Sequence, residues 1–225
     1  MDEEGRLISR VRRKAGSAKR RLAYALGSWQ ITNLYVMQLT YAEMSDLRTP
    51  GVEVLVREIT EKDNSALDAV ARFGFYGSRD FLEKCLRNGQ HCYVAEVQGK
   101  PVCYNWRATD KYYDFVLKRC FRLSPHEDYL LGAYTVPEFR GMGILPYLIK
   151  TSSEQKMRNS SALKAIGFMR VNNKAMERSL MKLGWIRVGR VGFIECFGIR
   201  WNFLIGRGVL PKTVKRNFIS LPAWK

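Results

Sequence analysis

The segment Tyr129–Ile149 constrains the fold most, because it joins a strand, a glycine-bearing turn and the start of a helix. Its first part, Tyr129–Val136, is an apolar run that predicts a buried strand, and Pro137 ends that run. Two glycines follow, and an apolar-periodic segment begins at Ile144. This layout brings free backbone N–H groups and a helix N-terminus to a phosphate. The segment therefore predicts an anion-binding turn in an α/β domain.

The spacing of this turn differs from the common phosphate loops. The P-loop pattern Gly-x-x-x-x-Gly-Lys-Ser/Thr is absent, and the dinucleotide pattern Gly-x-Gly-x-x-Gly lacks its third glycine. The run Arg140-x-x-Gly143-x-Leu145 instead resembles the acyl-CoA signature Gln/Arg-x-x-Gly-x-Gly/Ala of the GCN5-related N-acetyltransferase (GNAT) family. Leu145 departs from that signature, in which Gly or Ala is usual.

A second segment, Val171–Trp185, resembles the same family. Asn173 opens a predicted helix, and the helix ends in Lys182-x-Gly184-Trp185, where the family shows Lys-x-Gly-Phe. Asn at a helix start and Gly at its end also have a purely local explanation as caps. The family often carries a Tyr in this helix as the general acid, but no Tyr lies between Asn173 and Trp185. The general acid is therefore unassigned.

The resemblance covers residues 52–205 and implies an α/β fold of the GNAT type. In that fold a mixed central sheet is splayed at a bulge and flanked by helices on both faces. The implied co-substrate is acetyl-CoA or another acyl-CoA, with its pantetheine amides along the central strand and its pyrophosphate at the turn. The implied cofactor-binding residues are Ala133, Tyr134, Thr135, Val136, Arg140, Gly141, Met142, Gly143, Ile144, Leu145 and Asn173.

The implied chemistry is direct attack of a neutral amine on a thioester, which needs a group that takes a proton. Some family members use an acid near the start of the central strand, where this chain has Glu127 and Asp128. Glu195, an acid inside an apolar run, is a third candidate base. The alternatives are a solvated strand start for the first two and a structural ion pair for Glu195.

Hydrophobic periodicity and turn signals predict the order β-α-α-β-β-β-α-β-α-β-β for the domain. The strands are predicted at 52–59, 91–97, 102–109, 129–136, 163–171, 185–196 and 199–205. The helices are predicted at 60–73, at 78–87, from 144 onward and at 173–183. Residues 29–38 are apolar enough for a strand or a helix against the core, and 110–126 have no clear pattern.

The break Thr49-Pro50-Gly51 predicts a domain boundary. Residues 1–50 are then a basic amphipathic arm with a lead-in, 51–205 the acyltransferase domain, and 206–225 a basic tail. Apolar residues recur at helical spacing between basic ones over 5–26, which predicts a helix that either binds an anionic membrane surface or packs on the domain.

The net charge of +17 is concentrated at the two ends of the chain. Residues 1–26 hold eight Lys/Arg against three Asp/Glu, and residues 200–225 hold six Lys/Arg and no acid. A nucleic-acid enzyme would carry its charge on the folded face, so this distribution disfavours nucleic acid as the partner.

Cysteine and histidine usage excludes other classes. The five cysteines form no Cys-x-x-Cys pair, and the chain has only two histidines, so we expect reduced thiols and no metal site. No apolar run is long enough for a membrane span, and the N-terminus lacks the apolar region of a secretory signal. We expect a cytoplasmic protein, which associates peripherally with the inner membrane face if residues 5–26 bind the membrane.

Three functions stay open at this level. The first is acetyl transfer from acetyl-CoA to a primary amine of a small molecule. The second is transfer of a longer acyl chain from an acidic acyl carrier protein at the membrane, which the basic ends and Leu145 favour. The third is a non-catalytic basic module that binds nucleic acid or membrane.

Overall fold

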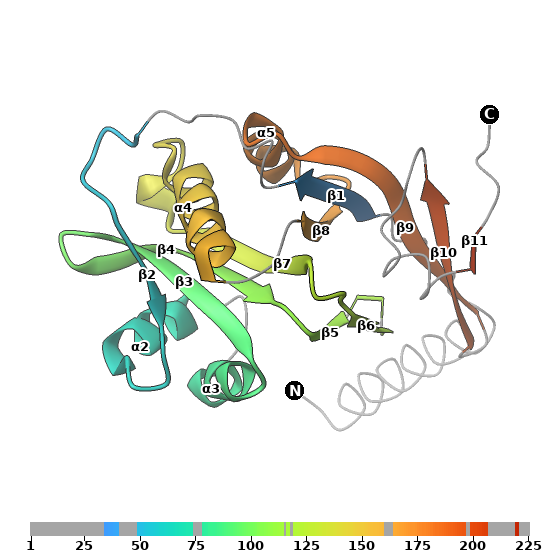
Figure 1. The fold of residues 1–225 in the computed structure, drawn as a ribbon, viewed down its shortest axis with the longest axis horizontal. Helices are drawn as coiled ribbons and strands as arrows, with labels where there is room; N and C mark the ends of the chain where they lie inside the picture. Colours follow the sequence, from blue (N-terminus) through green and yellow to red (C-terminus); the bar gives the residue numbers. More distant parts are fainter. Residues whose placement is uncertain are drawn as a thin grey trace, which may run out of the picture.

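A computed structural model describes residues 34–40, 49–73, 78–114, 116–117, 119–159, 164–196, 199–206 and 219–220. These residues form a nine-stranded sheet in the order β11-β10-β9-β1-β8-β7-β4-β3-β2 and a separate two-stranded sheet, β5-β6 (Figure 1). The nine-stranded sheet is mixed, because β7 and β8 run parallel whereas β4 and β7 run antiparallel. The predicted α/β class with a mixed central sheet is confirmed.

The predicted strands and helices occur in the predicted order, and β1, β5, β6 and β11 are additional strands. The strands are β1 Leu34–Thr40, β2 Leu55–Ile59, β3 Gln90–Val97, β4 Lys100–Ala108, β5 Lys111–Asp114, β6 Arg119–Arg122, β7 Glu127–Thr135, β8 Lys164–Arg170, β9 Ile186–Cys196, β10 Ile199–Gly206 and β11 Ile219–Ser220. The helices are α2 Asn64–Arg72, α3 Arg79–Arg87, α4 Ile144–Asn159 and α5 Lys174–Lys182, with a 3-10 turn η2 at Pro137–Phe139.

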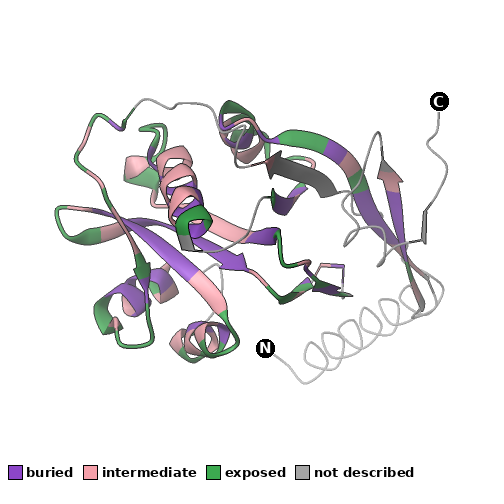
Figure 2. Ribbon diagram, in the orientation of Figure 1, coloured by how far each residue is buried: buried purple, intermediate pink, exposed green. Residues whose placement is uncertain are grey.

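Helices cover both faces of the sheet around β3 and β4, which are buried along most of their length (Figure 2). On one face, α2 and α3 pack against side chains that alternate along these strands, including Cys92, Tyr104 and Trp106. On the other face, α4 packs through Ile144 and Leu148 against the intervening positions, such as Tyr93 and Cys103. The alternation that predicted these strands thus serves two separate apolar clusters.

The strand β1 lies inside the sheet, although it precedes the boundary predicted after Pro50. It pairs antiparallel with β8 from Leu34↔Arg170 to Thr40↔Lys164, and it pairs with β9 on its other edge. Part of the segment expected to lead into the domain therefore supplies the strand that joins β8 to β9. Periodicity alone left a strand or a helix open for residues 29–38, and the pairing on both edges explains why the described part, from residue 34, is a strand.

Residues 110–126, which had no clear sequence pattern, contain the hairpin of β5 and β6. The connection between its strands is held by Asp114, whose Oδ1 accepts a hydrogen bond of 2.7 Å from the backbone N–H of Leu117. Burial raises the pKa of Asp114 above its ordinary value, and the hydrogen bonds to it act in the opposite direction. Each strand has only four residues, too few for a period-two pattern to stand out.

The two charged ends of the chain lie largely outside the described residues. The helix predicted at 5–26 is among them, so the membrane hypothesis stays a prediction. Of the C-terminal tail, β11 pairs parallel with β10 through Phe203↔Ile219 and Leu204↔Ser220. Among the described helices, none is both long and apolar enough to cross a membrane.

The position of β1 predicts how truncations behave. Deletion of residues 1–33 retains β1 and should leave one cooperative unfolding transition. Deletion of residues 1–48 removes the strand between β8 and β9 and should abolish that transition, because both neighbours lose their hydrogen-bond partner. Circular dichroism during heating measures both.

A point variant provides the control for chain length. Gln38→Pro, in the full chain, removes one backbone N–H from a strand that is paired on both edges, and it should lower the melting temperature. Equal stability of both truncations would show that β1 is dispensable.

Candidate functional site

The sheet divides between β7 and β8. These strands pair in parallel only from Glu127↔Lys164 to Leu130↔Gly167. Beyond Leu130, β7 continues along β4, whereas β8 continues along β1. Residues 131–135 of β7 therefore present one backbone edge that pairs with no strand of the described part of the chain.

A β-bulge marks the point of division. On β4, Trp106 and Arg107 are consecutive, but their partners on β7 are Gly132 and Leu130, so Leu131 is an extra residue. A bulge bends its strand and increases the local twist. This accounts for the departure of β7 from β8 one residue after their last pair. The splay at a bulge, which the family resemblance implied, is present.

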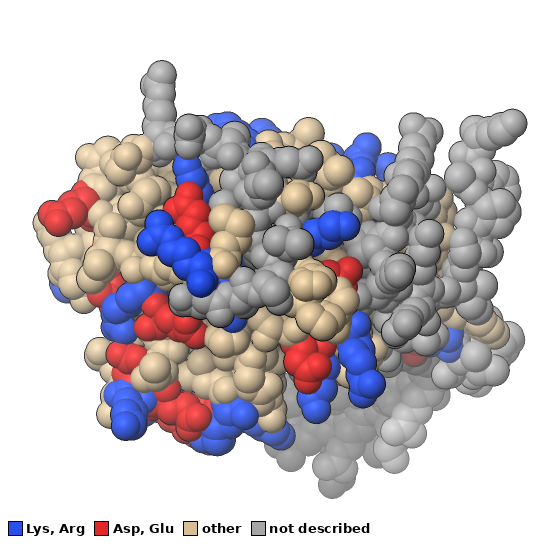
Figure 3. Space-filling view, viewed as in Figure 1, with Lys and Arg blue, Asp and Glu red and all other residues tan. Residues whose placement is uncertain are grey.

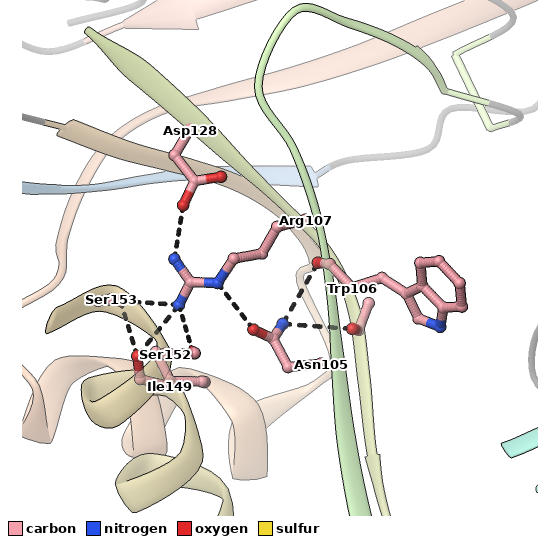
Figure 4. A network of polar contacts seen from close by, with 8 residues as sticks. Asn105, Trp106, Arg107, Asp128, Ile149, Ser152 and Ser153 are labelled. Atoms are coloured by element: carbon pink, nitrogen blue, oxygen red, sulfur yellow. Dashed lines mark hydrogen bonds and ion pairs between the residues drawn. The ribbon is translucent and has the colours of Figure 1, made fainter. Parts of the chain in front are cut away.

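A buried network centred on Arg107 holds this junction together (Figure 4). Arg107 is 1% exposed, and its guanidinium donates to Asp128 Oδ2 at 2.5 Å, to Ser152 Oγ at 2.9 Å and to Ser153 Oγ at 2.7 Å. It also donates to the carbonyl of Ile149 at 3.0 Å. One side chain of β4 is thereby bonded to β7 and to the middle of α4.

Asn105 extends the network to the bulge itself. Its Oδ1 accepts a 3.0 Å hydrogen bond from Arg107 Nε, and its Nδ2 donates to the carbonyls of Trp106 and Gly132 at 3.3 and 3.4 Å. These two residues lie opposite each other next to the extra residue of the bulge. The side chain of Asn105 thus donates hydrogen bonds to carbonyl groups at the place where the bulge interrupts the regular β-ladder.

The turn after β7 has the geometry that an anion needs. Gly141 and Gly143 have φ of 81° and 78°, a left-handed conformation that side chains other than glycine disfavour. Arg140 donates through Nε to the carbonyl of Thr135 at 3.0 Å, and its guanidinium lies 5.4 Å from the ring centroid of Tyr134. Arg140 is therefore fixed at the end of β7, on the surface.

The first turn of α4 offers two backbone donors at this place. Tyr147 N–H already bonds to the carbonyl of Gly143, and Pro146 has no N–H. The amides of Ile144 and Leu145 remain at the positive end of the helix dipole. The side chain of Leu145 packs against the cluster around Ile144 and also against the one around Leu130. It therefore belongs to the core on both sides of the splay.

The aromatic residue of the open edge is part of a stack on the α2–α3 face of the sheet. Tyr134 lies 5.3 Å from Phe73 and 6.2 Å from Tyr104 between ring centroids, and Phe73 lies 5.9 Å from Tyr104. All three pairs are near-parallel, with interplanar angles of 11° to 26°. Phe73 and Tyr134 are only half-buried.

Asn173 caps α5, and its Oδ1 accepts a 3.3 Å hydrogen bond from Met176 N–H. This is the local role that the sequence pattern allowed. The side chain is exposed, and its amide nitrogen takes no part in that cap, so the pantetheine contact that the family implies stays a prediction.

The three predicted bases are all engaged in contacts within the protein. Asp128 is fully buried against Arg107, and the buried Glu127 accepts a 3.0 Å hydrogen bond from Ser124 N–H. Glu195 forms an ion pair with Arg200 across β9 and β10. The burial of Glu127 and Asp128 contradicts a solvated strand start for these two, and the contact of Glu195 favours its structural ion pair.

Arg107 and Asn105 are the residues that sequence reasoning missed. The strand Val102–Ala108 reads VCYNWRA, in which two polar residues occupy alternate positions of an otherwise apolar strand. Two buried polar residues on one face of a strand need partners. This pattern is the signal from which the sequence could have predicted a buried polar network. The hydroxyl groups of Ser152 and Ser153 on α4 are among the partners that it requires.

Thiol and metal chemistry have no support at this site. Cys103 Sγ lies 3.2 Å from Thr135 Oγ1, directly under the open edge, but burial raises the pKa of this thiol to about 12. It is therefore protonated near neutral pH and a poor nucleophile. Within the described ranges, no three His, Cys, Asp or Glu side chains cluster so that they could hold a metal ion.

Comparison with known proteins yields similar solved structures. No protein-family model matches the chain. No curated protein sequence matches it. Among the solved structures, the ribosomal-protein-alanine N-acetyltransferase of Brucella melitensis biovar Abortus 2308 is 16% identical with a TM-score of 0.42, over 56% of this chain and 87% of that one.

Two further solved structures are similar to the chain. An aminoglycoside N-acetyltransferase in complex with CoA is 14% identical with a TM-score of 0.47, over 61% of this chain and 91% of that one. The GCN5-related N-acetyltransferase from Kribbella flavida is 14% identical with a TM-score of 0.48, over 72% of this chain and 56% of that one. All three structures are 14–16% identical to the chain, and each TM-score is below 0.5. The strand order, bulge and splay described above carry the fold class.

The Arg107 network predicts a large effect of Asp128→Asn on stability. The change leaves the Arg107 guanidinium buried without its counter-charge, and breaking such a pair costs about 3–5 kcal/mol. Urea denaturation of variant and parent measures the free energy of unfolding. Glu195→Gln, at a partly exposed pair, should cost less than about 1 kcal/mol. Equal losses for the two variants would contradict the assigned role of Asp128.

Proposed function

We propose that the protein is an N-acyltransferase that moves an acyl group from acyl-CoA to a primary amine of a small molecule. One observation carries the proposal: the unpaired edge of β7, residues 131–135, leads directly into the turn and N-terminus of α4. An extended amide-containing chain can add to such an edge as a further strand. An anionic group at its other end then meets the turn.

The proposed contacts use this chain's own groups. The amides of Ile144 and Leu145, the left-handed turn at Gly141 and Gly143, and the guanidinium of Arg140 bind the pyrophosphate. The backbone of β7 pairs with the pantetheine amides. The open stretch has five residues, about 16 Å at 3.3 Å per residue, and it ends at Leu131. The thioester therefore lies beside the bulge.

The proposed reaction is a direct attack of the neutral amine on the thioester carbonyl. A backbone N–H of the β7 edge donates to the carbonyl oxygen and stabilises the negative charge that develops there. The N–C bond forms, the C–S bond breaks, and the thiolate of CoA leaves. Because Glu127, Asp128 and Glu195 are engaged elsewhere, we assign the amine proton to solvent water.

A charge reversal in the turn tests cofactor binding. Gly143→Glu places a carboxylate where the pyrophosphate is proposed to bind, and it should lower acetyl-CoA affinity at least about 100-fold through repulsion and blocked amides. Isothermal titration calorimetry with acetyl-CoA measures the affinity.

The matched control is Gly99→Glu in the β3–β4 turn. Gly99 has φ of 72°, close to the 78° of Gly143, and neither glycine has a heavy atom within 4 Å of an added Cβ. Both variants therefore carry the same strain and the same charge. Equal acetyl-CoA affinity in the two variants, or no binding by the parent, would overturn the proposal and favour a non-catalytic module.

The acyl chain length is open to a donor panel. Leu131 is half-buried and packs against the apolar clusters on both sides of the bulge, so side chains already occupy the surroundings of the proposed thioester. We expect acetyl-CoA to give a kcat/KM at least about tenfold above octanoyl- and palmitoyl-CoA in a thiol-release assay. A preference for a long-chain thioester, or for an acyl carrier protein as donor, would reverse this assignment.

A further inference from the structure

We infer that the acceptor amine carries an aromatic or other planar apolar group, and that the half-buried rings of Phe73 and Tyr134 bind it. The inference rests on the proposed function, since it takes the thioester to lie beside the bulge. It assigns a specificity role to Phe73, the residue at the C-terminal end of α2.

The acceptor must reach the thioester from the face of the sheet that α2 and α3 cover. On the opposite face, α4 packs directly on β3 and β4 through Ile144 and Leu148, and the Arg107 network bonds α4 to β4 and β7. In the described part of the chain, α4 thus occupies that face next to the bulge. Tyr134 and Leu131 both belong to the apolar cluster on the α2–α3 face, because the bulge shifts the alternation of β7 by one residue.

The side chains on this face are apolar and planar. Tyr134 and Phe73 are stacked at 5.3 Å and are half-buried, whereas Tyr104 beneath them is fully buried. Across the bulge, Leu131 also packs with the cluster that contains Tyr112 and Phe168, both half-buried. A second planar group placed on these rings would bury further apolar surface and gain an offset-stacked contact.

Two contacts hold the orientation of the Tyr134 ring. Arg140 lies over it at 5.4 Å, and Arg140 is itself held by the carbonyl of Thr135. Phe73 is near-parallel to Tyr134. A ring whose position is set in this way loses little conformational freedom on binding, which favours a specific contact over a general apolar surface.

The carboxylates of this region disfavour a polycationic acceptor. On α2 and α3, Asp68 and Glu83 both pair with Arg79, at 2.9 and 2.8 Å, and Glu61 pairs with Arg87 at 3.2 Å. Figure 3 accordingly shows acidic and basic side chains interspersed over these helices. Of the acids nearer the bulge, Asp114, Glu127 and Asp128 are buried and hydrogen-bonded, whereas Asp110 and, on α3, Asp80 are exposed.

Of the stretches between the described ranges, 41–48 contain Glu43 and Asp46. Residues 74–77, 115, 118, 160–163 and 197–198 contain neither Asp nor Glu. A polyamine or an aminoglycoside needs several available carboxylates, and most of those described near the bulge are buried or paired, so the chemistry favours an acceptor with one amine and an apolar body.

A panel of primary amines tests the inference with the full-length protein and acetyl-CoA. It compares 2-phenylethylamine, butylamine, spermidine and kanamycin by thiol release. We expect kcat/KM for 2-phenylethylamine to exceed that for butylamine by about tenfold and that for both polycations by more. Highest activity with spermidine or kanamycin, or transfer to none of the four amines by a protein that binds acetyl-CoA, overturns the inference while leaving acyl-CoA binding intact.

Two variants test whether the ring of Phe73 causes the preference for an aromatic amine. Phe73→Leu keeps an apolar side chain without the ring, and it should reduce the ratio of kcat/KM between 2-phenylethylamine and butylamine to near one, with the acetyl-CoA affinity unchanged. Phe81→Leu is the matched control, because Phe81 contributes a ring to the same apolar cluster from α3. It should keep the ratio of the parent, and melting curves establish that both variants fold.

The outcomes separate the inference from the function on which it rests. A ratio that falls equally in both variants, or in neither, overturns the assignment of Phe73. Failure of the parent to bind acetyl-CoA by calorimetry overturns the proposed function itself, and with it the inference.

Discussion

The buried ion pair of Arg107 and Asp128 is the interaction on which the other features of the structure depend. A guanidinium in the core is tolerated only when its donors are satisfied, and here they reach the Asn105 side-chain oxygen on the same strand and, on other elements, one carboxylate, two serine hydroxyls and one carbonyl. Because the acceptors on other elements lie on β7 and α4, the charge can stay buried only while both elements are docked on β4. The pair therefore fixes where α4 lies relative to the end of β7, and this sets the distance between the open edge and the anion-binding turn.

The bulge at Leu131 then converts a continuous sheet into one with an open edge. Without the extra residue, β7 would follow β8 along its whole length and its backbone groups would be paired. With it, five residues of one edge become available for an added strand. An unpaired edge inside a protein is normally a liability, so its persistence next to a preformed turn favours a binding function. The network and the bulge are linked directly, because Asn105 bonds to Arg107 and to the carbonyl of Gly132.

Charge and aromatic character are separated over the two faces of the junction. The α4 face carries buried ionic and hydroxyl groups, whereas the α2–α3 face carries the rings of Phe73, Tyr104 and Tyr134. Burial on the α4 face lowers the pKa of Lys156, which nonetheless interacts favourably with Asp128 and Glu58. The buried polar groups thus hold α4 in place together with the apolar contacts of Ile144 and Leu148, and the α2–α3 face is the one that we propose for the acceptor.

The sequence by itself determined most of the elements and the glycine-bearing turn before α4. Local rules suffice for these: Pro137 ends the strand, two glycines adopt left-handed angles, and Asn173 caps a helix. The tertiary structure decided the rest. It placed β1 between β8 and β9, because hydrogen-bond partners far apart in sequence cannot be read from periodicity. It also showed Asp128 in a buried pair, since the position of a carboxylate on a strand does not reveal that an arginine 21 residues earlier faces it. The polar alternation of Asn105 and Arg107 was visible in the sequence, but its meaning required the bulge and the serines of α4, which only packing brings together.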